Sequence, residues 1–142
     1  MNVKIKKLHP DAALPVYSST DAAGADLCSV EEVTIDPGCT ALVHTGLAME
    51  LPKGYGGFIF ARSGLAAKRG LAPANKVGVI DADYRGEVLV ALLNHGSQPQ
   101  TVEKGERIAQ LVLLPAPQAT FLEDDLQDTS RSTGGFGSTG RK

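Results

Sequence analysis

The chain lacks tryptophan, and aromatic residues make up only 5% of its 142 residues. Its two cysteines, Cys28 and Cys39, are too few for a disulfide framework and lack metal-ligand spacing, so we expect reduced thiols in a reducing compartment. No apolar run approaches the roughly 18 residues that a membrane span requires, and MNVKIKKLHP has no long apolar stretch typical of a signal peptide. A soluble, cytoplasmic protein with no membrane partner is predicted.

The chain also lacks an excess of positive charge. Fourteen lysines and arginines stand against 16 acidic residues, which gives a formal net charge of -2 and a pI near 5.9. Non-specific binding of a nucleic acid requires a basic surface, so we predict no direct nucleic-acid partner and only a few, local phosphate contacts. The length is about that of one domain, enough to bury a core without metals or disulfides.

Glycine and proline, in contrast, are frequent. Sixteen glycines and eight prolines punctuate short apolar runs, a pattern that predicts an all-β sandwich or barrel. One short helix is expected at 63–68, where Ser63 precedes good helix formers and Gly70 stops the helix. The expected strands include residues 3–5, 41–43, 58–60, 77–80, 88–93 and 108–114.

Residues 78–87, GVIDADYRGE, place two aspartates and a tyrosine between two apolar runs, which predicts a β-hairpin. Asp81 directly follows an apolar run, at the mouth of a pocket. There it can orient a water beside a planar or sugar-like ligand, with the Tyr84 ring three residues further on. The alternative is an ordinary turn whose aspartates bond their own backbone amides, and composition alone favours this alternative.

Three further segments carry groups that suit a phosphorylated ligand. Asp26 in AGADL either forms an Asx-type turn or faces a hydrated metal ion. Arg62, Ser63 and Gly64 in ARSGL either bind phosphate or form a helix N-cap beside an exposed arginine. Gln110 in GERIAQLV either points inward and needs a partner, or alternates outward to solvent.

The chain changes character after Pro117, becoming acidic over 123–128 and then nearly free of apolar residues. We therefore expect a domain over 1–122 and an arm over 123–142. Composition alone indicates a disordered terminus. Phe136, a lone aromatic between glycines, favours instead an arm that closes over a ligand with a flat face and anionic oxygens.

Together these segments resemble the five motifs of the trimeric deoxyuridine triphosphatases (dUTPases). They occur in order as AGADL, ARSGLA, the block from Asn75 through GVIDADYRGE, GERIAQLV and GGFGSTG, across nearly the whole chain. One departure is Arg131-Ser132, where the family commonly has Arg-Gly. The resemblance implies a jelly-roll-like, distorted β-barrel in a homotrimer, with active sites built from three subunits and a C-terminal arm closing over a neighbouring subunit's site.

The reaction implied by this resemblance is hydrolysis of dUTP to dUMP and pyrophosphate by in-line attack of water on the α-phosphorus. It keeps uracil out of DNA and supplies dUMP for thymidylate synthesis. Asp81 would orient and deprotonate the water, and Mg²⁺ would bind oxygens of all three phosphates and keep several waters, one or more of them held by Asp26. The implied substrate-binding residues are Asn75 and Gly78 at the uracil, Tyr84 at the deoxyribose, Ser63, Gly64, Arg62 and Gln110 at the phosphates, and Arg131, Phe136, Gly137, Ser138 and Thr139 from a neighbouring arm.

Two other functions fit the sequence less well. A dCTP deaminase on the same fold would have a second serine where Gly64 stands, and it would lack the Gly-Phe-Gly tail. A catalytically silent nucleotide-binding module should lack Asp81, Asp26 or the tail arginine, and this chain has all three. Asp83 and Glu87 receive no ligand role, and for Arg107 an internal salt bridge is expected.

Overall fold

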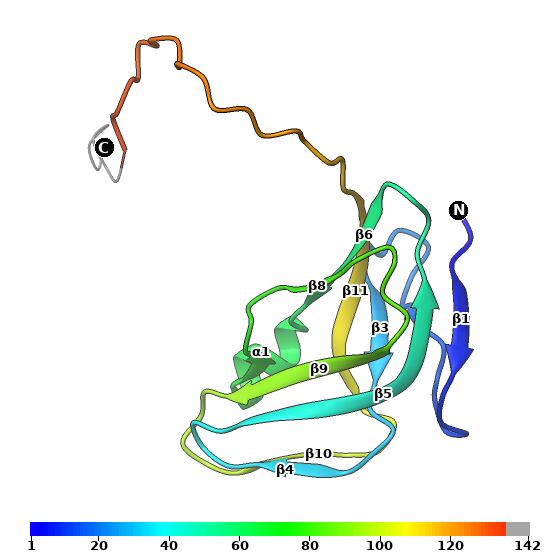
Figure 1. The fold of residues 1–142 in the computed structure, drawn as a ribbon. Helices are drawn as coiled ribbons and strands as arrows, with labels where there is room; N and C mark the ends of the chain where they lie inside the picture. The colour runs from blue at the N-terminus through cyan, green and yellow to red at the C-terminus, as the bar shows by residue number, and fades with distance from the viewer. Residues whose placement is uncertain (136–142) are drawn as a thin grey trace.

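The computed structural model describes residues 1–135 and contains eleven strands and one short helix there, which confirms the expected β-rich class (Figure 1). The elements are β1 (Lys4–Lys7), β2 (Val16–Tyr17), β3 (Ala25–Cys28), β4 (Val33–Ile35), β5 (Thr40–Glu50), β6 (Tyr55–Phe60), α1 (Ser63–Arg69), β7 (Leu71–Pro73), β8 (Gly78–Ile80), β9 (Glu87–Asn94), β10 (Gln100–Val102) and β11 (Arg107–Pro115). Cys28 and Cys39 are both free thiols, as expected.

The strands form two main antiparallel sheets and one two-stranded ribbon. One sheet has the order β1-β5-β9-β7, the other has the order β2-β3-β11-β6-β8, and β10 pairs with β4. Consecutive strands often lie in different sheets, so most contacts join distant segments of the chain. The jelly-roll connectivity and the trimer stay predictions for this single chain.

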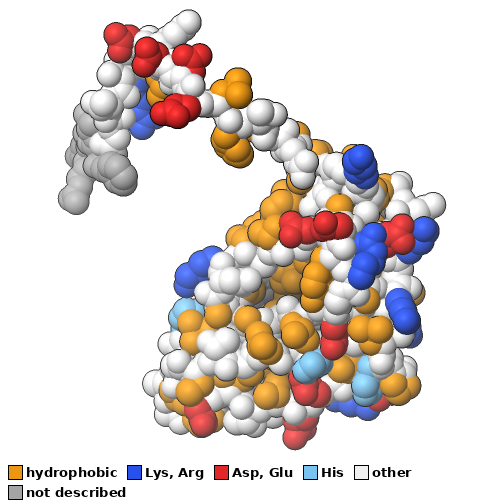
Figure 2. All heavy atoms as spheres, viewed as in Figure 1, with side chains coloured by type: hydrophobic (Ala, Val, Ile, Leu, Met, Phe, Trp, Pro, Cys, Tyr) orange, Lys and Arg blue, Asp and Glu red, His pale blue; other side chains and the backbone are white. Residues whose placement is uncertain are grey.

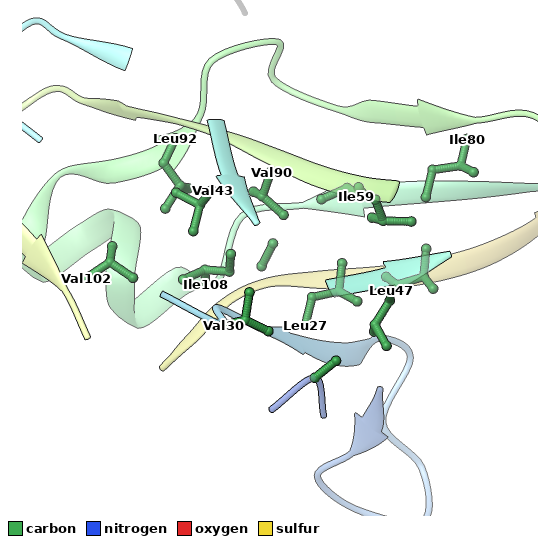
Figure 3. Close-up of a cluster of buried hydrophobic side chains, with 14 of the residues drawn as sticks. Leu27, Val30, Val43, Leu47, Ile59, Ile80, Val90, Leu92, Val102 and Ile108 are labelled. Carbon is green, nitrogen blue, oxygen red and sulfur yellow. The ribbon is translucent and has the colours of Figure 1, made fainter. Parts of the chain in front are cut away.

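The core is a cluster of aliphatic side chains contributed by both sheets (Figure 3). Along β9 the even-numbered residues Val88, Val90 and Leu92 are almost fully buried, while the residues between them are partly exposed. This alternation is what period-2 side-chain geometry gives when one face of a strand packs inward. Each such side chain contributes about 1.5 to 3 kcal/mol by leaving water, which fixes the strands that carry the polar loops.

The helix agrees closely with the prediction and ends at Gly70, whose φ of 68° is the left-handed conformation that glycine adopts at little cost. Ser63, however, does not cap it. Arg62 occupies the N-cap position without a side-chain capping bond, so Ser63 is the first helical residue and its side chain is exposed. Arg69 anchors the last turn by donating to Gln100 Oε1 at 3.0 Å and by pairing with Glu106.

The predicted hairpin over residues 78–87 is wrong. β8 pairs with β6, while β9 pairs with β5 and β7, so the two strands belong to different sheets. Both apolar runs do form strands, but each finds its partner far away in sequence, and local patterning does not report such partners. Residues 81–86 therefore cross from one sheet to the other, which places Asp81 and Tyr84 on a connection between the sheets.

Residues 116–135 contain no helix or strand, and Figure 1 shows them leading away from the two sheets. Acidic side chains gather on this arm (Figure 2). It also carries three large apolar side chains, since Phe121, Leu122 and Leu126 are 95%, 82% and 94% exposed. Among the described residues, no helix combines the length and apolar character that crossing a bilayer would require.

Candidate active site

A pocket of about 370 Å³ brings together residues from three of the predicted segments. We call it the Asp26 pocket. The sheet register explains the gathering, because Asp26 on β3 lies opposite Gln110 on β11, and Gln110 lies opposite Phe60, just before Arg62. Its lining residues are Ser18, Ser19, Ala22, Ala23, Gly24, Asp26, Arg62, Ser63, Gly64 and Gln110.

Two arginines flank the Asp26 carboxylate, whose side chain is only 14% exposed. Arg62 Nε donates to Oδ1 at 2.8 Å, and Arg107 Nη1 donates to Oδ2 at 3.2 Å. Two guanidinium groups thus meet one carboxylate; Arg62 lines the pocket, where its guanidinium suits an anionic ligand. The internal salt bridge expected for Arg107 is confirmed, and its partner is Asp26.

Gln110 points into this pocket and is partly buried. Its Nε2 donates to the backbone oxygen of Ala61 at 2.8 Å, so part of its bonding capacity is met inside the protein. Its Oε1 approaches Gly24 so closely that a Cβ added there would lie 2.7 Å from it. A side chain at position 24 would therefore displace the Gln110 side chain, and the inward alternative for Gln110 is the correct one.

The Asp26 pocket contains a single carboxylate, and residues 1–135 contain no cluster of three or more His, Cys, Asp or Glu side chains suited to a metal ion. Mg²⁺ commonly keeps several waters and takes its other ligands from substrate phosphates. One carboxylate whose oxygens retain unused lone pairs fits a hydrated magnesium ion held through water, and it does not fit an all-protein cage.

A second pocket, of about 220 Å³, gathers Asn75, Gly78, Asp81 and Tyr84. We call it the Asp81 pocket. Asp81 is exposed at its rim, and the backbone bond from Tyr84 N to Asp81 O, at 3.1 Å, closes a turn. Space at Gly78 is limited, because an added Cβ would lie 3.2 Å from Ile59 Cβ and 3.4 Å from Asn75 Nδ2. The remaining walls are Ile59, Val79, Ile80, Glu87, Val88 and Leu89.

The two pockets share no lining residue and lie far apart on one chain. From β3 to β8 there are three strand spacings, or about 14 Å across the sheet. Along the strands, Asp26 is level with Phe60 of β6, because both lie opposite Gln110. Asp81 follows Ile80, which pairs with Gly57, so Asp81 is level with the residue before Gly57 on β6. The two aspartates are therefore offset by about 13 Å along the strand direction. The structure thus collects the predicted residues into two separate groups.

Up to residue 135, the arm contributes no side chain to either pocket in this chain. Arg131 is exposed and donates from Nε to the Gly134 oxygen at 2.9 Å. Ser132, at the position where the motif commonly has glycine, has a φ of 42°, a backbone region that glycine tolerates better than serine. The predicted residues Phe136, Gly137, Ser138 and Thr139 lie outside the described residues.

The motif-based reading missed three residues of the Asp26 pocket, namely Ser18, Ser19 and Ala22. They precede AGADL in a loop that follows β2. The sequence SST at 18–20 could have indicated these residues, because its hydroxyl groups stand close to a predicted phosphate-binding segment.

Comparison with known proteins agrees with this geometry. The family model for dUTPase matches residues 10–140. The chain belongs to the dUTPase family. It is 55% identical to the deoxyuridine 5'-triphosphate nucleotidohydrolase of Desulfitobacterium hafniense strain DCB-2, over 99% of this chain and 97% of that protein. The corresponding protein of Nautilia profundicola is 50% identical over 99% of this chain and its own full length.

Solved dUTPase structures share the fold. A mutant of the dUTPase of Staphylococcus bacteriophage 80alpha, solved with dUpNHpp, matches with a TM-score of 0.87 and 28% identity, covering 98% of each chain. A mutant dUTPase from phage phi11 of S. aureus matches with a TM-score of 0.84 and 22% identity, covering 91% of this chain and 100% of the other; that protein coordinates a structural Mg(II) ion.

Proposed function

We propose that this dUTPase-family chain hydrolyses dUTP to dUMP and pyrophosphate, with water attacking the α-phosphorus in line. The observation that carries the proposal is the 55% identity with a deoxyuridine 5'-triphosphate nucleotidohydrolase over 99% of the chain. The reaction removes dUTP, which keeps uracil out of DNA, and its product dUMP is available for thymidylate synthesis.

The Asp81 pocket takes the nucleoside. In this proposal Asn75 and the backbone near Gly78 hydrogen-bond the uracil edge, and the pocket excludes the 5-methyl group of thymine; the tight packing of Gly78 against Ile59 and Asn75 supports a narrow pocket. A steric wall of this kind discriminates against a larger base more strongly than a loose apolar pocket does. Tyr84 lies against the deoxyribose, where a 2'-hydroxyl would meet the ring, so ribonucleotides are rejected.

The Asp26 pocket takes the triphosphate. Ser63 and the Gly64 amide bind the α- and β-phosphates, while Arg62 and Gln110 support the phosphate chain. When bound, Mg²⁺ neutralises charge that develops on the phosphates. Asp26 would accept hydrogen bonds from the waters of the bound ion, and the flanking arginines hold the Asp26 carboxylate in place.

Asp81 orients and deprotonates the attacking water. Aspartate carboxylates are weak bases toward free water, so Asp81 acts mainly by holding the water in line with the leaving pyrophosphate. The positive groups at the phosphates lower the barrier by stabilising the charge of the transition state. The water held by Asp81 and the positive groups of the Asp26 pocket must act on the same α-phosphorus. That phosphorus therefore has to lie within reach of both pockets.

One chain does not meet that requirement, because its two pockets are offset by about 14 Å across the sheet and about 13 Å along it. We therefore propose a homotrimer in which the Asp81 pocket of one subunit faces the Asp26 pocket of another. A third subunit lends its arm, including Arg131, Phe136, Gly137, Ser138 and Thr139. The almost fully exposed Phe121 and Leu126 support this, because such apolar side chains gain free energy by packing on a neighbour.

Turnover measured with dUTP, dTTP, UTP and dCTP, each with and without magnesium, tests the proposed function. We expect magnesium-dependent release of pyrophosphate from dUTP alone. Ammonia release from dCTP would identify a deaminase instead, and binding of dUTP without any turnover would identify a silent nucleotide-binding module.

A further inference from the structure

The ring of Tyr84 folds back across the backbone of the same connection. Its Oη donates to the backbone oxygen of Glu87 at 3.0 Å. A Cβ added to Gly86 would lie 2.4 Å from Tyr84 Oη and 2.6 Å from Cζ. Position 86 therefore has to lack a side chain if the ring is to occupy this place, and residues 86 and 87 together form a seat for the ring.

The Glu87 side chain fixes this seat to the neighbouring strand β5. Oε1 accepts a hydrogen bond from Gly46 N at 2.8 Å, and Oε2 lies 2.9 Å from His44 Nδ1. The next residue is held too, because Thr45 Oγ1 donates to Val88 O at 2.6 Å in the buried interior. These bonds anchor the first residues of β9 to β5 at one point.

That point is an irregularity in β5, where the register with β9 shifts between His44 and Ala48. Gly46 has a φ of 67°, and an added Cβ would lie 2.7 Å from His9 Cβ. Its amide is turned to the Glu87 carboxylate instead of to a ladder partner. A bulge at this position changes the direction of the backbone and leaves one amide without a partner in the sheet. The Glu87 carboxylate accepts the hydrogen bond of that amide.

We propose that Gly86 and Glu87 are positioning residues that set the sugar selectivity of the enzyme by fixing the Tyr84 ring. Glu87 lines the Asp81 pocket on one side and contacts His44 and Gly46 on the other, so it connects the β5 bulge to the ring. This inference rests on the proposed function, in which Tyr84 rejects the 2'-hydroxyl of ribonucleotides.

The direct test is the ratio of kcat/KM for dUTP to that for UTP in Gly86→Ala. The three atoms nearest to the new methyl group all belong to the Tyr84 side chain, which can rotate away, so the protein should keep its unfolding temperature. We expect the dUTP/UTP ratio to fall about 10- to 100-fold, because small displacements of a positioning group cost rates of that size. An unchanged ratio would overturn the proposal.

Glu87 supplies an independent pair of variants. Glu87→Gln keeps an acceptor for the Gly46 amide, whereas Glu87→Ala removes it. The preference for dUTP over UTP should therefore be largely retained in Glu87→Gln and lost in Glu87→Ala. Glu50→Gln and Glu50→Ala are the matched controls, since Glu50 makes only an exposed pair with Lys4, and both should keep the wild-type ratio. Equal ratios in both Glu87 variants would contradict the anchoring role.

A measurement without substrate separates this inference from the proposed function. The chain has three tyrosines and no tryptophan, so selectively labelled tyrosine rings give few aromatic NMR signals. Gly86→Ala should shift the Tyr84 ring signals and leave those of Tyr17 and Tyr55 in place. Unshifted Tyr84 signals would refute the seat, whereas a wild-type protein without dUTP hydrolysis would refute the proposed function alone.

Discussion

Two carboxylates illustrate how residue environment divides the chemistry. Asp26 is 14% exposed and lies between Arg62 and Arg107, which both donate to its carboxylate and hold it in place. Asp81 is exposed on a connection between sheets, where its carboxylate can face a water. The first is therefore suited to organising charge, and the second is suited to orienting a nucleophile.

Replacing Asp81 tests that division. We expect Asp81→Asn to bind dUTP as wild type does and to lose about 10²- to 10⁴-fold in kcat, the usual contribution of a general base. Asp83→Asn, two residues away on the same connection, serves as the control and should retain turnover. Steady-state kinetics and a binding isotherm with a non-hydrolysable analogue measure both quantities, and an unchanged kcat would remove Asp81 from this role.

His44 predicts a pH dependence of stability. Its hydrogen bond to Glu87 raises the pKa of His44 above the ordinary value of 6.5. Because the pKa is higher in the folded state, protonation of His44 stabilises the folded protein, and this stabilisation is complete below about pH 6.5. It is lost as the pH rises through the pKa that His44 has in the folded state. The effect should be small, because the His44 side chain is 48% exposed.

The measurement is the unfolding temperature at about pH 6 and about pH 8.5. Wild type should gain more stability on acidification than His44→Gln does, and His95→Gln should behave like wild type. An identical pH dependence in wild type and His44→Gln would show that the pair with Glu87 contributes nothing to stability.

At the scale of elements, the sequence predicted which residues form strands better than it predicted which strands pair. The helix was predictable because Gly70 marks its end locally. The connection at 81–86 was not, because the partners of β8 and β9 are β6 and β5, and their pairing depends on closure of the whole core. The partners of Asp26 were equally distant, since Arg62 and Arg107 lie 36 and 81 residues further along the chain.

The arm is an element whose part in catalysis can be tested by removal. Residues 116–135 add no strand to either sheet, so deleting the chain from Asp128 onward should leave a folded trimer. Turnover should fall at least about 100-fold, because in the proposed mechanism the arm completes the phosphate site and excludes water. Light scattering reports the assembly and kinetics reports turnover, and full activity in the truncated chain would rule out the closing arm.

At the scale of the whole molecule, the separation of the two pockets supports the proposal that the active site forms between subunits. A ring of three subunits joined head to tail can bring the Asp81 pocket of each against the Asp26 pocket of the next. The same arrangement explains why residues with complementary roles gather separately within one chain. Catalysis should therefore be a property of the trimer and be absent from an isolated subunit.

Mixed trimers test this directly. Asp81→Asn and Arg62→Ala should each be nearly inactive alone, but trimers reassembled from an equal mixture should recover about a quarter of wild-type turnover. That fraction follows because each site needs an intact residue from two subunits, each present about half of the time. A mixture that stays as inactive as its components would place both residues in one subunit's site.

Hydrolysis of dUTP in water enriched in ¹⁸O tests the central claim most directly, since it reports the substrate and the attacked phosphorus together. Attack of the Asp81-oriented water on the α-phosphorus predicts dUMP carrying one ¹⁸O atom and pyrophosphate carrying none, as read by mass spectrometry. Pyrophosphate that carries ¹⁸O would contradict attack on the α-phosphorus, and an absence of dUTP hydrolysis would contradict the proposed function.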